Sequence, residues 1–161
     1  MKLFDEAALQ SIRDQLLKKG ESVSIAESVT CGLLQFAMSN TLDTVQFFQG
    51  GITVYNPNQK FRQLNIEPTH ALSVNCVSER VAIELARNVR IKFNNEYGIG
   101  ITGYASPVPE SDNKMFAYFA ITHDTRVLHA ARLDTGPREG IGVQLYYANE
   151  VLKSFAAVLS S

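Results

Sequence analysis

Cysteine, histidine and tryptophan are scarce in this chain of 161 residues, which has two cysteines, three histidines and no tryptophan. Cys31 and Cys76 form no CxxC pair, so the chain lacks the cysteine spacing of a disulfide framework or a zinc site. His70, His123 and His129 are scattered and show no metal-ligand spacing. We therefore expect no disulfide framework, no metal and no other cofactor.

The chain also lacks a strong charge of either sign and any long apolar run. Its formal net charge is −1 and its pI is about 6.3, so it has no basic footprint of the kind that nucleic-acid-binding proteins carry. The N-terminus turns acidic at Asp5 and Glu6, where a signal peptide would begin its apolar core, and no later segment is long enough to span a bilayer. We expect a cytoplasmic protein that binds neither nucleic acid nor membranes.

The composition, with 45% hydrophobic and 19% charged residues, is sufficient for one domain with its own core over residues 1–161. Helical spacing of apolar residues predicts helices over 5–19, 33–38, 57–64 and 78–93, and a last helix with an apolar stripe over 145–159. Strands are predicted over 23–25, 47–55, 97–102, 115–122 and 126–133, with a bulge at 50–51, an exposed loop at 103–113 and a hairpin turn at 124–125. This order predicts an α/β protein, a three-layer α/β/α sandwich whose mixed sheet contains one antiparallel hairpin.

Two hydroxyl residues, Ser28 and Thr30, stand at the predicted turn between the strand that begins at Val23 and the helix that begins at Leu33. A serine in such a turn can stand clear of the backbone, while unpaired N–H groups at the helix start point toward the group it attacks. This arrangement is typical of hydrolases. Serine and threonine are also preferred helix N-caps without a catalytic role, and the turn alone does not decide between these interpretations.

The segment Gly98 to Gly103 matches the GxGxxG pattern of dinucleotide-binding proteins. That fingerprint must follow a strand and open a helix, whereas this segment lies within a predicted strand and continues into a proline-containing loop. The sequence therefore does not predict a Rossmann cofactor site. Small residues on this strand instead indicate a close approach of another backbone or of a ligand.

The segment from Thr135 to Glu139 is predicted to start the last helix, with Pro137 in its first turn. Arg138 then brings a positive charge to the positive end of the helix dipole, and a bound phosphate or carboxylate would resolve that conflict. Alternatively, Arg138 pairs with Glu139 or with another surface acid. Both interpretations are open.

Five groups of residues, taken together, resemble the landmarks of the CinA C-terminal domain family in order and spacing, over nearly the whole chain. They are Ala26 to Leu34, Gly50 to Asn56 with Lys60, Val77 to Glu79, Thr102 and Gly103 with Pro107, and Gly136 with Arg138. In that family the domain is a nicotinamide-nucleotide amidohydrolase. The resemblance also implies the stand-alone form, without the additional N-terminal domain of long CinA proteins.

This resemblance implies deamidation of nicotinamide mononucleotide to nicotinate mononucleotide and ammonia, in pyridine-nucleotide salvage, with Ser28, Tyr55 and Lys60 as the catalytic residues. A serine hydroxyl is a weak nucleophile until a base takes its proton, and serine–lysine pairs achieve this without histidine. Lys60 acts as this base, or holds Tyr55 ionised, if burial lowers its pKa or its charge lies against the phenol. The N–H groups from Thr30 to Gly32 are the candidate oxyanion hole.

The substrate-binding residues that the resemblance implies are spread over the same landmarks. They are Thr30, Cys31, Gly32, Gly51, Asn56, Thr102, Gly103, Ser106 and Arg138. Arg138 and helix N-termini are expected to hold the phosphate of the nucleotide.

The chain departs from the family pattern around the expected pocket. Family members have a Gly-Gly pair where this chain has Cys31-Gly32, and an Ile-Ala-Gly-Pro run and a glycine-rich loop where it has Tyr104-Ala105-Ser106-Pro107 and a loop without glycine. Side chains in place of glycine narrow or reshape a pocket.

Two alternatives to the family activity therefore stand beside it. The first is an amidase of the same chemistry that accepts a different small amide. The second is a degenerate nucleotide-binding or protein-interaction module that has kept the fold and lost turnover. The resemblance and the apolar pair Phe47-Phe48 further predict a homo-oligomer.

Overall fold

The computed structural model describes residues 2–161, and Met1, the first residue of the predicted domain, lies outside the described residues. Its helices are α1 (Glu6–Lys19), α2 (Leu33–Ser39), α3 (Pro57–Leu64), α4 (Pro68–Ser73), α5 (Glu79–Phe93) and α6 (Ile141–Ser160), with short 3-10 turns η1 (Thr44–Gln46) and η2 (Pro109–Ser111). Its strands are β1 (Val23–Glu27), β2 (Phe48–Thr53), β3 (Tyr97–Gly103), β4 (Phe116–His123) and β5 (Arg126–Asp134).

The five strands form one mixed sheet in the order β2-β1-β3-β4-β5. Strand β1 pairs in parallel with β2 and β3, whereas β4 is antiparallel to both β3 and β5. The predicted mixed sheet with one antiparallel hairpin, β4–β5, is therefore confirmed. The register between β1 and β2 shifts between Phe48 and Gly50, next to the predicted bulge.

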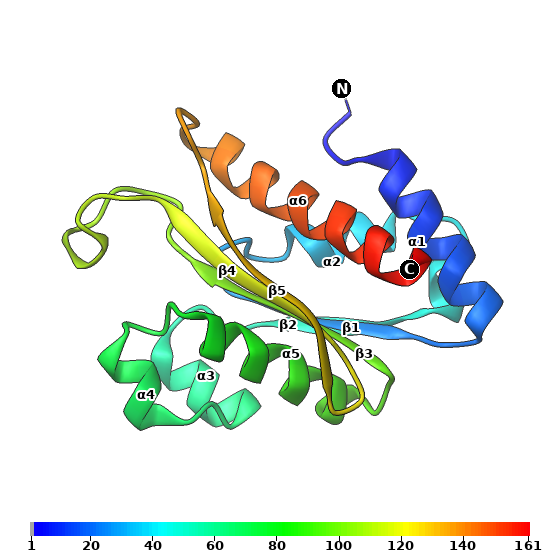
Figure 1. The fold of residues 1–161 in the computed structure, drawn as a ribbon, viewed down its shortest axis with the longest axis horizontal. Coiled ribbons are helices and arrows are strands. Elements are labelled where there is room, and N and C mark those ends of the chain that lie inside the picture. Colours follow the sequence, from blue (N-terminus) through cyan, green and yellow to red (C-terminus); the bar gives the residue numbers. More distant parts are fainter. Residues whose placement is uncertain (1) are drawn as a thin grey trace.

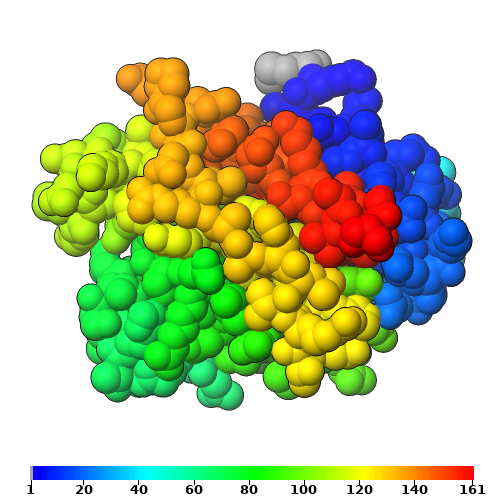
Figure 2. All heavy atoms as spheres, in the orientation of Figure 1, coloured from blue at the N-terminus to red at the C-terminus, as the bar shows by residue number. Residues whose placement is uncertain are grey.

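Helices cover both faces of the sheet (Figure 1). One core cluster joins the sheet to α1, α2 and α6, and another joins its opposite face to α3, α4 and α5. Figure 2 shows the C-terminal end of α6 lying against α1, so the two ends of the described chain close the same layer. The fold is the α/β/α sandwich that the sequence predicts.

Helix α5 lies very close to β3 because that strand carries glycine at two positions. A Cβ on Gly98 would overlap the carbonyl oxygen of Ala86, and a Cβ on Gly100 would lie 2.5 Å from that of Ala82. The glycines of the rejected GxGxxG pattern thus admit another backbone, as predicted, and hold α5 against the centre of the sheet.

The last helix begins later than predicted. Helix α6 begins at Ile141, and Pro137 and Arg138 precede it in an irregular segment. Gly136 and Gly140 adopt φ values of 60° and 55° in this segment, which interrupt a right-handed helix. The prediction that Pro137 stands in the first helical turn is therefore wrong. Helix α4 and the turns η1 and η2 were not predicted from the spacing of apolar residues.

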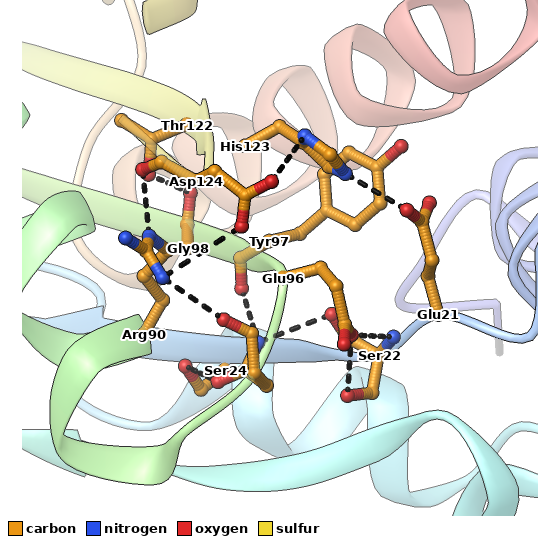
Figure 3. Close-up of polar contacts among 11 residues, drawn as sticks. Glu21, Ser22, Ser24, Arg90, Glu96, Tyr97, Gly98, Thr122, His123 and Asp124 are labelled. Atoms are coloured by element: carbon orange, nitrogen blue, oxygen red, sulfur yellow. Dashed lines mark hydrogen bonds and ion pairs between the residues drawn. The ribbon is translucent and has the colours of Figure 1, made fainter. Parts of the chain in front are cut away.

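A polar cluster joins the N-terminal ends of β1 and β3 (Figure 3). The Asn95 amide donates to the carbonyl oxygens of Ser22 and Tyr97 and accepts from the hydroxyl of Ser24. Beside it, the ring of His123 contacts the Glu21 carboxylate at 2.9 Å. These contacts hold β1 and β3 together at their N-terminal ends. The carboxyl ends of the two strands lie at the opposite end of the sheet.

Phe47 is fully buried in the core, so it cannot contribute to the subunit interface that the Phe47-Phe48 pair suggested. The large apolar side chains that are well exposed nearby are instead Phe36, Leu42 and Val45. Within residues 2–161, none of the helices combines the length and the apolar composition needed to cross a bilayer.

Candidate active site

Ser28 lies at the carboxyl end of β1, immediately after the strand. Its N–H donates to the carbonyl oxygen of Ile101 on β3 at 3.2 Å, so the backbone is still attached to the sheet where the side chain leaves it. The residue is 6% exposed. In open α/β sheets ligands bind outside the carboxyl ends of the strands, which is where Ser28 is placed.

Lys60 reaches Ser28 from helix α3. Asn56 caps this helix by accepting the N–H of Gln59, and Pro57 occupies its first turn, so Lys60 is directed back toward the sheet. Its Nζ lies 3.0 Å from the Oγ of Ser28 and 3.0 Å from the carbonyl oxygen of Val54. The distance between the Lys60 Nζ and the Ser28 Oγ is short enough for direct proton transfer between them.

The Lys60 side chain is buried, which is unusual for lysine. Burial lowers the pKa of Lys60 because the charged ammonium loses hydration, and the electrostatic effect of the nearby Cys76 thiol opposes that shift. Burial in turn raises the pKa of Cys76. The neutral amine, which is the form that can accept the proton of Ser28, therefore forms at a lower pH than in a free lysine.

Ser28 and Lys60 line a cavity of about 360 Å³, a size typical of small-molecule sites. The cavity also contains five other residues that the sequence predicts, namely Tyr55, Asn56, Thr102, Gly103 and Ser106. Its remaining lining residues are Val29, Pro57, Asn75, Cys76, Val77, Tyr104, Ala105 and Val108. The structure thus brings together residues from four separated segments of the chain, 28–29, 55–60, 75–77 and 102–108.

Two predicted residues in this wall have clear structural contacts. The Oγ1 of Thr102 donates to the carbonyl oxygen of Cys76 at 2.7 Å and so connects β3 to the turn before α5. A Cβ on Gly103 would lie 2.5 Å from the Cβ of Ala117 on β4. Both residues shape the cavity wall.

Tyr55 stands at the mouth of the cavity and is 68% exposed. Within residues 2–161 its hydroxyl has no hydrogen bond to Lys60 or Ser28, so the contact that would hold an ionised phenol against the lysine is not formed. The ring is placed where an entering ligand would contact it.

The turn after Ser28 is held by hydrogen bonds to Glu27, a residue outside the cavity lining. The Glu27 carboxylate accepts the Thr30 hydroxyl at 2.5 Å and the N–H groups of Gly32, Leu34 and Gln35. Thr30 and Gly32 are therefore not part of the cavity lining. Cys31 is exposed, has a φ of 46° and also lies outside this lining.

This turn changes the expected oxyanion hole. Of the three predicted N–H groups, that of Gly32 donates to Glu27 and that of Cys31 donates to the carbonyl oxygen of Ser28. In the part of the chain that the structure describes, the N–H groups of Val29 and Thr30 have no hydrogen-bond acceptor. Of these two residues, Val29 lines the cavity.

Gly51 and Arg138 also lie outside the cavity lining. A Cβ on Gly51 would lie 2.7 Å from the side chain of Gln35, so this glycine provides space for that side chain. The Arg138 guanidinium lies over the ring of Tyr146, 3.9 Å from its centre, and donates to the carbonyl oxygen of Thr135. It faces a separate hollow beside α6.

Asn75 and Tyr104 form a cross-cavity contact that was not predicted as part of the site. The Asn75 Nδ2 donates to the Tyr104 hydroxyl at 3.1 Å, from the turn before α5 to the loop after β3. Asn75 and Cys76 have φ values of 52° and 60°, conformations uncommon for residues other than glycine. No spacing in the sequence marks this pair, although Tyr104 lies in the run that departs from the family pattern.

The model of the CinA C-terminal domain family matches residues 5–156. A competence-damage inducible protein of Natranaerobius thermophilus is 33% identical over 152 residues, which cover 92% of this chain and 37% of the relative. A CinA-like protein of Prochlorococcus marinus is 30% identical over 161 residues, 98% of this chain and 37% of its own length. The chain therefore spans about one third of the length of these curated relatives.

Solved structures with the same fold include a competence or damage-inducible protein from Enterobacter asburiae, with a TM-score of 0.88 and 23% identity over 94% of this chain and 96% of that one. The protein CihA from Agrobacterium tumefaciens has a TM-score of 0.88 and 20% identity over 98% of this chain and 99% of its own. At these identities the likeness establishes the fold.

Proposed function

The chain belongs to the CinA C-terminal domain family, and on this premise we propose that it is an amidohydrolase that converts nicotinamide mononucleotide to nicotinate mononucleotide and ammonia. The observation that carries the proposal is the 3.0 Å contact between the Lys60 Nζ and the Ser28 Oγ in the wall of a cavity. A buried amine with a lowered pKa can act as the base that activates an adjacent serine hydroxyl as a nucleophile. A structural lysine would more commonly be solvated.

The proposed reaction begins when neutral Lys60 accepts the hydroxyl proton of Ser28 and the Oγ bonds to the carboxamide carbon. The carbonyl oxygen becomes an oxyanion, for which the candidate donor is the N–H of Val29, a residue of the cavity lining whose N–H has no acceptor among the described residues. The lysine then gives its proton to the amide nitrogen, the C–N bond breaks, and ammonia leaves. Water then transfers a proton to Lys60 while its oxygen bonds to the acyl carbon. The bond between this carbon and the Ser28 Oγ breaks, Lys60 returns the proton to the Oγ, and the acid product leaves as its carboxylate.

Tyr55 has a different role in this scheme from the one that the resemblance implies. Its exposed ring at the mouth suits contact with the aromatic ring of a substrate better than a proton relay through Lys60. A Tyr55→Phe variant separates the two roles. A contact role predicts a nearly unchanged kcat, whereas a proton-transfer role predicts a large loss of kcat.

The test of the proposed function is release of ammonia and nicotinate mononucleotide from nicotinamide mononucleotide by the purified protein, beside Ser28→Ala and Lys60→Ala. Turnover that both substitutions abolish, with circular dichroism unchanged, is the expected result. Measurable nucleotide binding without turnover in the parent protein would contradict the proposal and favour a binding module.

A second candidate is an amidase for a small amide that carries no phosphate group. Among the described residues that line the cavity, Lys60 is the one cation, and its amine is directed at Ser28 and Val54. Arg138, the expected phosphate ligand, faces the separate hollow. Ammonia release from nicotinamide riboside or nicotinamide, but not from the mononucleotide, would select this candidate.

A further inference from the structure

Glu27, the last residue of β1, is a fully buried acidic side chain directly before Ser28. Carboxylates are almost never fully buried unless they are paired. Within residues 2–161 no lysine or arginine forms an ion pair with it. The cost of burying this carboxylate is offset instead by hydrogen bonds from the turn after Ser28 and from the start of α2.

Five hydrogen bonds converge on this carboxylate. Its Oε2 accepts the Thr30 hydroxyl at 2.5 Å and the N–H groups of Gly32 and Leu34, both at 3.1 Å. Its Oε1 accepts the N–H of Gln35 at 2.8 Å and the Gln35 side-chain amide at 3.2 Å. All five partners donate, which matches an ionised carboxylate because that group is purely an acceptor.

These contacts fix the turn from both sides. The backbone around Ser28 is held to β3 by the bond to Ile101, while Glu27 connects the following residues to β1. Gln35 extends the network toward β2, where its amide lies 3.4 Å from the Oγ1 of Thr53 and its stem occupies the space above Gly51. The turn that carries Ser28 is therefore attached to β3 before it and to Glu27 after it, although Glu27 itself does not line the cavity.

We propose that Glu27 is a positioning residue, whose carboxylate holds the 28–32 turn so that the Ser28 Oγ meets the Lys60 amine. The inference rests on the proposed function in taking Ser28 as a nucleophile. Carboxylate bonds to the N–H groups of α2 also prevent those groups from serving substrate. The simpler alternative is that Glu27 only caps α2 and stabilises the fold.

The test measures the reactivity of Ser28 without reference to the amide substrate. The second-order rate constant for labelling by a fluorophosphonate probe is determined for the parent protein and for Glu27→Gln, with mass spectrometry to confirm Ser28 as the labelled residue. Glutamine has the same shape but brings an NH₂ group against donors, so the turn must shift. We expect a rate constant lower by about 10- to 100-fold per folded molecule, as small misplacements of reacting groups produce.

A second pair of variants keeps the test decisive if Glu27→Gln does not fold. Thr30→Val removes the hydroxyl that donates to Glu27 at nearly constant volume, and Thr30→Ser restores a hydroxyl. Labelling should be slow in Thr30→Val and substantially recovered in Thr30→Ser. Equal rate constants in the two variants would overturn the proposal.

Ser24→Ala is the matched control for a loss of stability alone. Ser24 lies on the same strand, three residues before Glu27, and donates a buried hydrogen bond to Asn95 near the N-terminal end of the strand. The Ser24→Ala variant loses this bond, so its melting temperature should fall while its labelling rate constant stays unchanged. If Glu27→Gln also melts earlier but labels at the parent rate, Glu27 is only a cap. If the parent protein is neither labelled nor active, the proposed function fails.

Discussion

The Nζ of Lys60 lies 3.0 Å from the Oγ of Ser28, although the two residues are 32 positions apart in the sequence. Strand β2 lies between them in the sequence and pairs in parallel with β1. Helix α3 therefore begins near the carboxyl ends of these strands, where Ser28 also lies. The lysine is carried there by a helix whose start is defined by Asn56 and Pro57. The pair is therefore a product of sheet order and helix capping together.

Replacement of Lys60 by methionine should abolish activity and stabilise the fold. The free energy of unfolding at pH 7 should rise by about 0.5–2 kcal/mol, because a buried amine is replaced by an apolar side chain of similar length. The gain should shrink as pH rises through the lowered pKa of Lys60 and past 10.5, because the lysine becomes neutral first in the folded and then in the unfolded protein. Urea denaturation at several pH values measures it, and a gain that grows with pH would contradict this explanation.

The pH dependence of kcat/KM should show a rising limb governed by Lys60. Burial lowers the pKa of this residue below 10.5, so the active neutral amine accumulates as pH rises through that lowered value. A Tyr55→Phe variant should retain the position of the limb, which assigns it to the lysine. Movement of the limb in that variant would assign it to the phenol instead.

Gly98→Ala should be strongly destabilising, by about 3 kcal/mol or more, because its Cβ would overlap the backbone of α5 at Ala86. Gly142→Ala is the matched control. A Cβ at this position in the first turn of α6 meets nothing within 4 Å, and alanine favours the helix by about 0.5–1 kcal/mol. Thermal denaturation of both variants should give shifts of opposite sign, and equal shifts would mean that α5 can move away from β3.

Alkaline conditions should destabilise the protein through Tyr97. Burial and the nearby Glu21 carboxylate raise the pKa of Tyr97 to about 12 from 10.0 in the unfolded chain. Its contribution is complete below pH 10 and is lost as pH rises toward 12, because only the unfolded chain then ionises. Tyr97→Phe should reduce the slope of stability against pH in this window. Burial also raises the pKa of Tyr147, so part of the slope should persist.

Most elements of the fold follow from local patterns in the sequence, although α4 and the start of α6 do not. Apolar spacing and capping residues predicted α1, α3 and α5 to within one residue, because each such helix depends on contacts between close neighbours in the chain. The turn at Ser28 was likewise visible as hydroxyl residues between a strand and a helix. Lys60 was predicted by the family resemblance, and its spacing from Ser28 alone would not have indicated it.

Tertiary structure decided which of these residues meet. It placed Lys60 against Ser28, left Tyr55 exposed at the mouth and directed Arg138 onto Tyr146. The contact between Lys60 and Ser28 joins residues far apart in the sequence, and the position of Arg138 depends on the irregular segment before α6, neither of which the spacing of apolar residues encodes.

The start of α2 shows the same division within a single turn. Its sequence predicted free N–H groups beside the nucleophile, since local spacing does not show which acceptor those groups meet in the fold. In the folded protein Glu27 is fully buried beside these groups, and a buried carboxylate is costly unless it accepts hydrogen bonds. It therefore accepts the N–H groups of Gly32, Leu34 and Gln35. The sequence by itself determined that a turn bearing Ser28 would form here, and the burial of Glu27 decided which N–H groups at the start of α2 are occupied by its carboxylate.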